Sequence, residues 1–239
     1  GYQNGYLGRD RSSAGPGLLF DFIIVHESGH EWFANSITNK DVADMWIHES
    51  FTNYSESLFL EYHFTKAQAF EYIRGLRMNI QNQSPIIGEY NANRGGSGDM
   101  YDKGGNVLHT IRQIINDDKK WREILRGLGK TFYHQTVTTQ DIENYISTQS
   151  GIDFSKVFDQ YLRDIRIPSF EYFMKDNVMK VRWGNVIKDF DMPLRVIIAG
   201  KESWLSPTTS WTTVELTQEN PSIEVDANFY ISTLSVLGN

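Results

Sequence analysis

Apolar side chains recur at helical spacing along the first two thirds of the chain. The first of these stretches runs from residue 18 to about residue 36, with apolar residues at Phe22, Ile23, Val25, Phe33 and, just beyond it, Ile37. The same periodicity, together with capping signals, predicts further helices at 45–62, 66–82, 101–115, 119–130, 138–148 and 154–163. The chain up to about residue 165 is therefore predicted to be helical.

Polar residues mark where these helices begin. Asp44 is expected to cap the helix that starts at Met45, and Thr65-x-x-Gln68 forms a capping box before the next helix. Thr138-x-x-Asp141 approximates the same motif. The glycine-containing stretch 83–99 predicts a long loop, and loops of that length inside a compact domain are often functional.

The pattern changes after Pro168, where apolar and polar residues alternate over short stretches. This alternation predicts strands at 179–183, 194–198, 212–216 and 229–232. The sequence therefore predicts an α+β protein, with a helical domain over residues 1–165 and a small β-sandwich over residues 166–239.

Composition narrows the classes of function. The 239 residues include 40% hydrophobic and 22% charged residues, as in ordinary globular proteins. A formal net charge of −7 without a basic stripe disfavours nucleic acid as a partner. The chain has no cysteine, which excludes disulfides and thiolate ligands, and no apolar run reaches the roughly 18–20 residues of a membrane span. The opening residues 1–8 read as a loop inside a domain, so we expect a fragment of a longer protein.

The strongest chemical signal is the His-Glu-x-x-His motif at residues 26–30. On a helix, His26 and His30 lie one turn apart on the same face, where both imidazoles can bind one metal ion. Glu27 then projects beside the metal and can accept a proton from a metal-bound water. The alternative is an ordinary amphipathic helix with two histidines and a surface carboxylate.

A catalytic zinc site usually has three protein ligands, and Glu49 is the candidate for the third. The 18 residues between His30 and Glu49 allow the first helix to end and a second helix to return beside it. Two histidines and one carboxylate suit zinc. His48 is the competing ligand, but it points elsewhere on the helix, so we expect it not to bind the metal.

These motifs resemble those of the aminopeptidase N and leukotriene hydrolase family of gluzincin zinc peptidases. Glu49 lies in Trp-x-x-Glu-x-Phe-x-x-Tyr-x-Glu, and Trp32-Phe33-Ala34-Asn35 is similar to the family's Trp-Phe-Gly-Asn. Tyr101-Asp102-Lys103-Gly104 is similar to the family's Tyr-x-Lys-Gly. The resemblance covers the chain from about His26 to Gly105.

The resemblance implies a role for each matching residue. His26, His30 and Glu49 would bind one Zn²⁺ per chain, and Glu27 would polarise the zinc-bound water that attacks the scissile carbonyl. Tyr101 would donate a hydrogen bond to the developing oxyanion; its alternative is a core tyrosine at the start of a helix. Glu56, about two turns after Glu49, would orient an imidazole, or would be a solvated carboxylate on the helix surface.

The resemblance also implies a fold and an activity. The helical part would be the C-terminal part of a thermolysin-like catalytic domain, followed by a β-sandwich. The activity would be the removal of N-terminal residues from peptides. The alternatives are another zinc hydrolase, such as an endopeptidase or an epoxide hydrolase, and a non-catalytic peptide-binding relative.

The chain departs from the family in two places. Ser50 stands where the family commonly has glycine after the third ligand, and the Gly-x-Met-Glu-Asn motif that grips the free amine of the substrate is absent from the chain. We therefore expect a preceding part of the parent protein to complete the cleft, and the isolated chain to be weakly active or inactive. The surface resembles that of bacterial members, some of which are exported to the periplasm or outside the cell.

Overall fold

The computed structural model describes residues 9–175 and 177–236, so the loop predicted at residues 1–8 lies outside the described residues. The chain forms two compact units, one ending at Phe154 and the other beginning at Ser155. The division lies before the last helix, whereas the sequence placed it after that helix, at residue 165. The roles assigned to the two parts stay predictions.

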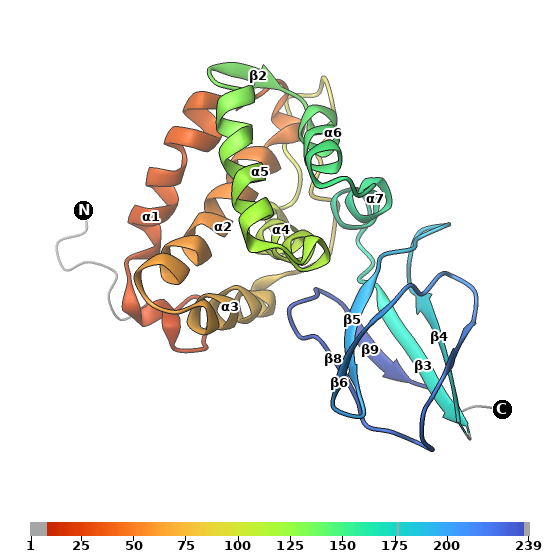
Figure 1. The fold of residues 1–239 in the computed structure, drawn as a ribbon. Helices are drawn as coiled ribbons and strands as arrows, with labels where there is room; N and C mark the ends of the chain where they lie inside the picture. Colours follow the sequence, from red (N-terminus) through yellow and green to blue (C-terminus); the bar gives the residue numbers. More distant parts are fainter. Residues whose placement is uncertain (1–8, 176, 237–239) are drawn as a thin grey trace. The chain divides into compact units, whose positions relative to one another are not determined.

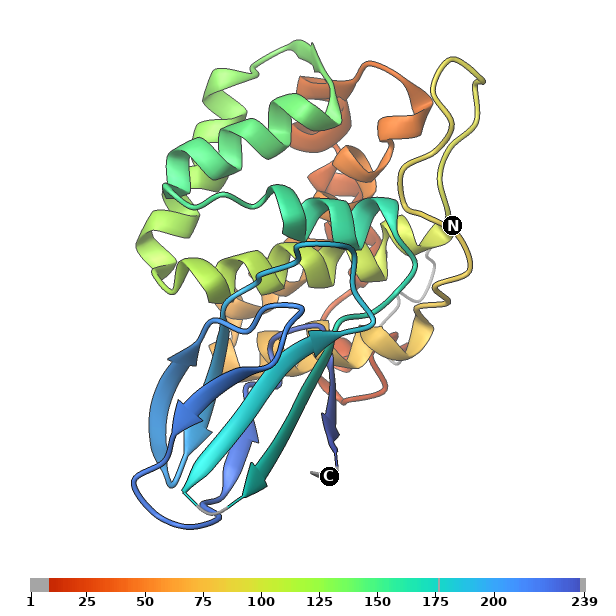
Figure 2. The same ribbon diagram turned by 90° about the vertical axis from the view of Figure 1, so that its right-hand side faces the viewer.

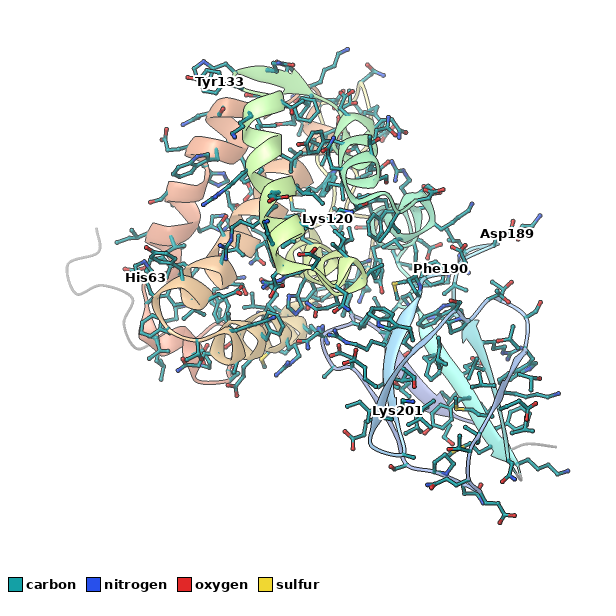
Figure 3. The ribbon with its side chains drawn as sticks, in the orientation of Figure 1. His63, Lys120, Tyr133, Asp189, Phe190 and Lys201 are labelled. Atoms are coloured by element: carbon teal, nitrogen blue, oxygen red, sulfur yellow. The ribbon has the colours of Figure 1, made fainter. Side chains whose placement is uncertain are left out.

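The first unit is built mainly from helices (Figure 1). They are α1 (Phe22–Gly29), α2 (Trp46–His63), α3 (Lys66–Gly75), α4 (Asp102–Ile115), α5 (Asp118–Thr131) and α6 (Thr139–Ser150). Lys120 on α5, labelled in Figure 3, donates to the carbonyl of Ser150 at the end of α6 and so joins these two helices. The expectation of a purely helical part was wrong, because β1 (Ile37–Asn39) and β2 (Gln135–Val137) pair as parallel strands.

Helix α2 is the centre of this unit, since it packs against α1, α3 and α4. Its apolar residues are buried on more than one side, at Trp46, Ile47, Phe51, Tyr54 and Leu60. Small residues let its neighbours approach closely. A Cβ on Gly29 of α1 would lie 3.1 Å from the Cγ2 of Thr52, and a Cβ on Gly104 of α4 would overlap the Oγ of Ser50.

The predicted helix over residues 18–36 is shorter and more varied than its periodicity suggested. Residues 16–19 form a 3₁₀ turn, α1 follows, and residues 31–36 form a wider π-helical turn. The backbone leaves helical geometry at Phe33, with φ −113° and ψ 73°, before β1 begins. Periodicity cannot reveal this change, since apolar residues continue at helical spacing through it.

The capping prediction was right at Thr138, right in part at Thr65 and wrong at Asp44. Thr138 and Asp141 form the full reciprocal capping box. The hydroxyl of Thr65 accepts from the N–H of Gln68 and so caps α3, while the Gln68 side-chain oxygen accepts from that same hydroxyl. Asp44 does not cap α2. It is buried and accepts hydrogen bonds from Thr139 and from the hydroxyl of Tyr90, while the Asp41 carboxylate caps the short 3₁₀ helix at 42–44.

The predicted helix 66–82 ends as a helix at Gly75, and a 3₁₀ turn follows over 76–79. The loop after it is tied to the rest of the unit by specific hydrogen bonds. The carboxylate of Asp99 accepts from the backbone N–H groups of Gln81 and Asn82, and Gly88 donates to the carbonyl of Ala43. This loop therefore fixes the residues that lead into Tyr101 and α4.

The second unit contains α7 (Ser155–Arg163) and two sheets. The first sheet has the order β7-β4-β3-β9, and the second has the order β6-β5-β8. Their bounds are β3 Ser169–Lys175, β4 Val178–Gly184, β5 Leu194–Ile198, β6 Lys201–Leu205, β7 Thr212–Glu215, β8 Ile223–Val225 and β9 Ser232–Ser235. The predictions found β4, β5 and β7, missed β3, β6 and β8, and placed the last strand three residues too early.

The interior of the second unit comes from alternating positions on these strands, several of which are visible in Figure 2. In β4 the buried residues are Met179, Val181 and Trp183, and the intervening ones are more exposed. The Trp183 indole donates to the carbonyl of Met192 and meets the Phe190 ring edge-on at 5.5 Å between centroids.

The structure confirms the coarse prediction of a protein that mixes helices with small sheets. Among residues 9–175 and 177–236, none of the helices has the length and apolar character needed to cross a bilayer.

Gly104 and Gly129 offer a paired test of the packing between α2 and α4. We expect Gly104→Ala to lower the free energy of unfolding by about 1–3 kcal/mol, because the new methyl group must displace Ser50. Gly129 lies in α5 with open space around its Cα, so Gly129→Ala should raise stability by up to about 1 kcal/mol. Urea unfolding measures both changes. Equal effects of the two substitutions would contradict the proposed close approach.

Candidate metal centre

Helices α1 and α2 bring His26, His30 and Glu49 together. One donor atom from each of the three side chains lies within 4.8 Å of the others. The Nε2 of His26 is 3.2 Å from the Oε2 of Glu49, and the Nε2 of His30 is 3.7 Å from the same oxygen. The helical spacing of the histidines and the close crossing of the helices at Gly29 thus produce the cluster that the sequence predicted.

Glu56 holds the far side of the His26 ring. Its side chain is completely buried, and its Oε1 lies 2.9 Å from the Nδ1 of His26. The Tyr72 hydroxyl donates to Oε2, and burial followed by the charge of Glu56 raises the pKa of Tyr72, so the phenol keeps its proton. A carboxylate in this position accepts a hydrogen bond from the Nδ1–H and leaves Nε2, which faces Glu49, as the nitrogen available to a metal ion.

The second histidine is oriented by the backbone. The Nδ1 of His30 lies 3.1 Å from the carbonyl oxygen of Phe33, which can point at the ring because the chain leaves helical geometry at that residue. The Phe33 ring stacks on Phe51 of α2 at 4.5 Å between centroids, which fixes the turn in place. His30, like His26, therefore presents its Nε2 to Glu49.

The charges around His26 favour a cation at this position. Burial alone would lower the pKa of His26, but the hydrogen bonds to Glu49 and Glu56 outweigh burial and raise it to about 9. A proton on Nε2 and a metal ion are alternative partners for the same lone pair.

The donor set also fits a particular kind of metal. Two imidazole nitrogens and one carboxylate oxygen, with both Nδ1 atoms engaged elsewhere, match the ligand types of catalytic zinc sites. The Nε2 of His48, the competing candidate ligand, has a different partner. It accepts a hydrogen bond from the N–H of Asn39 at 3.0 Å.

Tyr101 and Glu27 lie beside the cluster. Tyr101 directly precedes α4, and its ring stacks on His26 at 5.8 Å between centroids, with 36% of its surface exposed. Burial, and then the negative charge of Glu49, raise the pKa of Tyr101, and the charge of Glu27 acts in the same direction. Tyr101 is therefore a protonated hydrogen-bond donor that is accessible from solvent. Glu27 on α1 is also exposed to solvent.

Several residues of the centre belong to none of the sequence motifs described above. Tyr72 and Arg11 both contact Glu56, and Asp102 binds Arg11. Arg11 and Asp102 are 91 positions apart in the sequence. Arg11 belongs to no recognised motif, and Asp102 occupies the variable position of the Tyr-x-Lys-Gly motif. No local pattern signals these contacts, because they form only when distant segments fold together.

Comparison with known proteins gives a family match. The model of the peptidase family M1 domain matches residues 19–161, more than half of the chain. The match includes the metal cluster, Glu27, Glu56 and Tyr101.

Curated relatives include two bacterial aminopeptidases N. The chain is 24% identical to that of Lactobacillus helveticus over 198 residues, which cover 74% of this chain and 22% of the relative. It is 25% identical to that of Lactococcus lactis subsp. lactis over 186 residues, which cover 70% and 21%. The chain therefore spans about a fifth of the length of these relatives.

One solved structure shares the fold over nearly the whole chain. It is the crystal structure of Legionella pneumophila aminopeptidase A in complex with aspartic acid, with a TM-score of 0.69 and 14% sequence identity. The similarity covers 96% of this chain and 28% of that one.

The raised pKa of His26 predicts how zinc affinity depends on pH. Below about pH 9 the metal-free site holds a proton on His26 that zinc must displace. We therefore expect the affinity to rise about tenfold per pH unit between about pH 7 and pH 9, and to level off above that. Competition with a chromophoric chelator measures it. Affinity that does not change over this range would contradict the raised pKa of His26.

Proposed function

The chain belongs to peptidase family M1, and from this membership and the geometry of the site we propose that it is the metal-binding part of a zinc aminopeptidase. The observation that carries the proposal is the convergence of two imidazole Nε2 atoms on one carboxylate oxygen, with each Nδ1 held by a separate acceptor. The names of the relatives point to the same activity.

His26, His30 and Glu49 would hold one Zn²⁺ ion. When bound, zinc supplies a Lewis acid that polarises a carbonyl and lowers the pKa of a coordinated water. The chain's own contribution is orientation, because Glu56 and the carbonyl of Phe33 fix which nitrogen of each ring faces the metal.

Glu27 is proposed as the group that moves the proton. It directly follows His26 on α1, is exposed to solvent, and is near enough for its charge to act on Tyr101. From this place its carboxylate accepts a proton from the attacking water and returns it to the leaving amine, the usual task of a general acid and base.

Tyr101 is proposed as the donor to the oxyanion. Its raised pKa keeps the hydroxyl protonated, and its stacking on His26 places it beside the metal ligands. A preorganised donor at an oxyanion contributes about 3–4 kcal/mol to stabilisation of the transition state where such donors have been removed.

Three finer points belong to the same proposal. The first unit would be part of a thermolysin-like domain and the second a β-sandwich, as the resemblance implies. A preceding segment of a longer parent protein would complete the cleft and bind the substrate's free amine. The substrate would be a peptide with an unblocked N-terminus. Hydrolysis of N-acetylated peptides instead would favour an endopeptidase.

Substitution of Glu27 separates metal binding from proton transfer. In the full-length parent protein, we expect Glu27→Gln to keep its zinc but to lower kcat for aminoacyl-anilides by at least about 100-fold, because an amide cannot accept the proton. Glu31→Gln is the control, since Glu31 is an exposed carboxylate one turn later that contacts Asn35. Elemental analysis and initial rates give the two readouts. Turnover at the wild-type rate in Glu27→Gln would rule out this mechanism.

Substitution of Tyr101 tests the oxyanion donor. In the full-length parent protein, we expect Tyr101→Phe to lower kcat by about 100- to 1,000-fold while KM and zinc content stay close to those of the wild type. Tyr133, an exposed tyrosine near β2 in Figure 3, provides the control variant Tyr133→Phe. Loss of zinc from Tyr101→Phe would show instead that the tyrosine supports the metal site.

A further inference from the structure

We propose that Arg11 is a positioning residue for the metal centre, joining the carboxylate behind His26 to the start of the helix that follows Tyr101. The inference rests on the proposed function, because it concerns how the zinc ligands are held. Arg11 lies outside the His-Glu-x-x-His motif and outside the matched family domain, which begins at residue 19.

Arg11 contacts two acidic side chains from different helices. Its Nη2 donates to both carboxylate oxygens of Asp102 on α4, at 3.0 and 2.9 Å. Its Nη1 lies 3.8 Å from the Oε1 of Glu56 on α2, the same oxygen that faces the Nδ1 of His26. One guanidinium therefore lies between the carboxylate that orients a zinc ligand and the residue next to the oxyanion donor.

The electrostatic interactions of Arg11 are strong because these groups are largely buried. The side chain of Glu56 is 0% exposed and that of Asp102 only 7%, while Arg11 is 21% exposed. Two buried carboxylates that share one region repel each other strongly where the dielectric constant is low. The guanidinium between them offsets this repulsion and holds both in place.

Arg11 itself is held rigidly. Its guanidinium lies 5.0 Å from the centroid of the Phe22 ring, one turn before His26 on α1, and its carbonyl accepts a hydrogen bond from Asn79. The next residue, Ser12, is buried and packs so closely on Gly75 that no side chain would fit there. These contacts fix the backbone at residues 11 and 12, and the backbone in turn holds the Arg11 side chain in position.

The consequence for the centre follows from these contacts. Without the guanidinium, the carboxylates of Glu56 and Asp102 would move apart, and Glu56 would no longer hold the Nδ1 of His26 at 2.9 Å. Loss of such an outer partner of a metal-bound histidine typically lowers metal affinity by about 10- to 100-fold. Arg11 therefore acts on zinc through Glu56 and His26.

Zinc affinity measured by chelator competition on the whole chain tests this inference. We expect Arg11→Ala to weaken zinc binding by about 10- to 100-fold, and Arg11→Lys by a smaller factor, since an ammonium keeps the charge but cannot reach both carboxylates. Arg166→Ala is the control, because Arg166 pairs with Asp164 in the second unit. Thermal unfolding of each metal-free variant reports whether the fold is kept.

A double-mutant cycle separates positioning from general loss of structure. In a Glu56→Gln background, Arg11→Ala should have little further effect on zinc affinity, because the contact through which it acts is already changed. Wild-type affinity in both Arg11→Ala and Arg11→Lys would overturn the inference, as would full additivity with Glu56→Gln. If Arg11→Ala does not fold, Arg11→Lys decides alone. A wild-type chain that binds no zinc would instead contradict the proposed function.

Discussion

The hydrogen bond between the Nδ1 of His26 and the buried carboxylate of Glu56 determines what the rest of the site can do. It holds the Nδ1 proton in place, so that Nε2, which faces Glu49, is the nitrogen available to a metal ion. Helix α2 supplies both carboxylates, and their spacing of seven residues puts them two turns apart on one face. A single stiff helix therefore contacts both nitrogens of one imidazole. Any movement of α2 relative to α1 would disturb the two contacts together.

The packing of the first unit serves this arrangement. Gly29 on α1 and Gly104 on α4 allow close approach to α2 at Thr52 and Ser50, so the histidines and Tyr101 come to the glutamates from two sides. Ser50 stands where the family resemblance implies glycine. It has a structural role in this chain, because its hydroxyl donates to the carbonyl of Met100 at 2.7 Å. That bond ties α2 to the backbone just before Tyr101.

Much of the site could be predicted from the sequence because its chemistry lies in local spacing. The pair His26 and His30, the returning helix with Glu49, and the cap of α6 are all determined by residues close together in the chain. The turn at Phe33, the burial of Glu56 and the contacts of Arg11 could not be predicted, because each depends on segments that meet only in the folded state. The missed strands β3, β6 and β8 have the same origin, since their pairing partners are set by the sheet rather than by their own alternation.

The zinc stoichiometry of the purified chain, after reconstitution and removal of excess metal, tests the metal centre most directly. We expect one zinc ion per wild-type chain, and less than about a tenth of that in Glu49→Ala under the same conditions. The variant His48→Ala should bind zinc as the wild type does, because its Nε2 accepts a hydrogen bond from Asn39. No zinc in the wild type, or full retention in Glu49→Ala with loss in His48→Ala, would contradict the assignment of the metal centre.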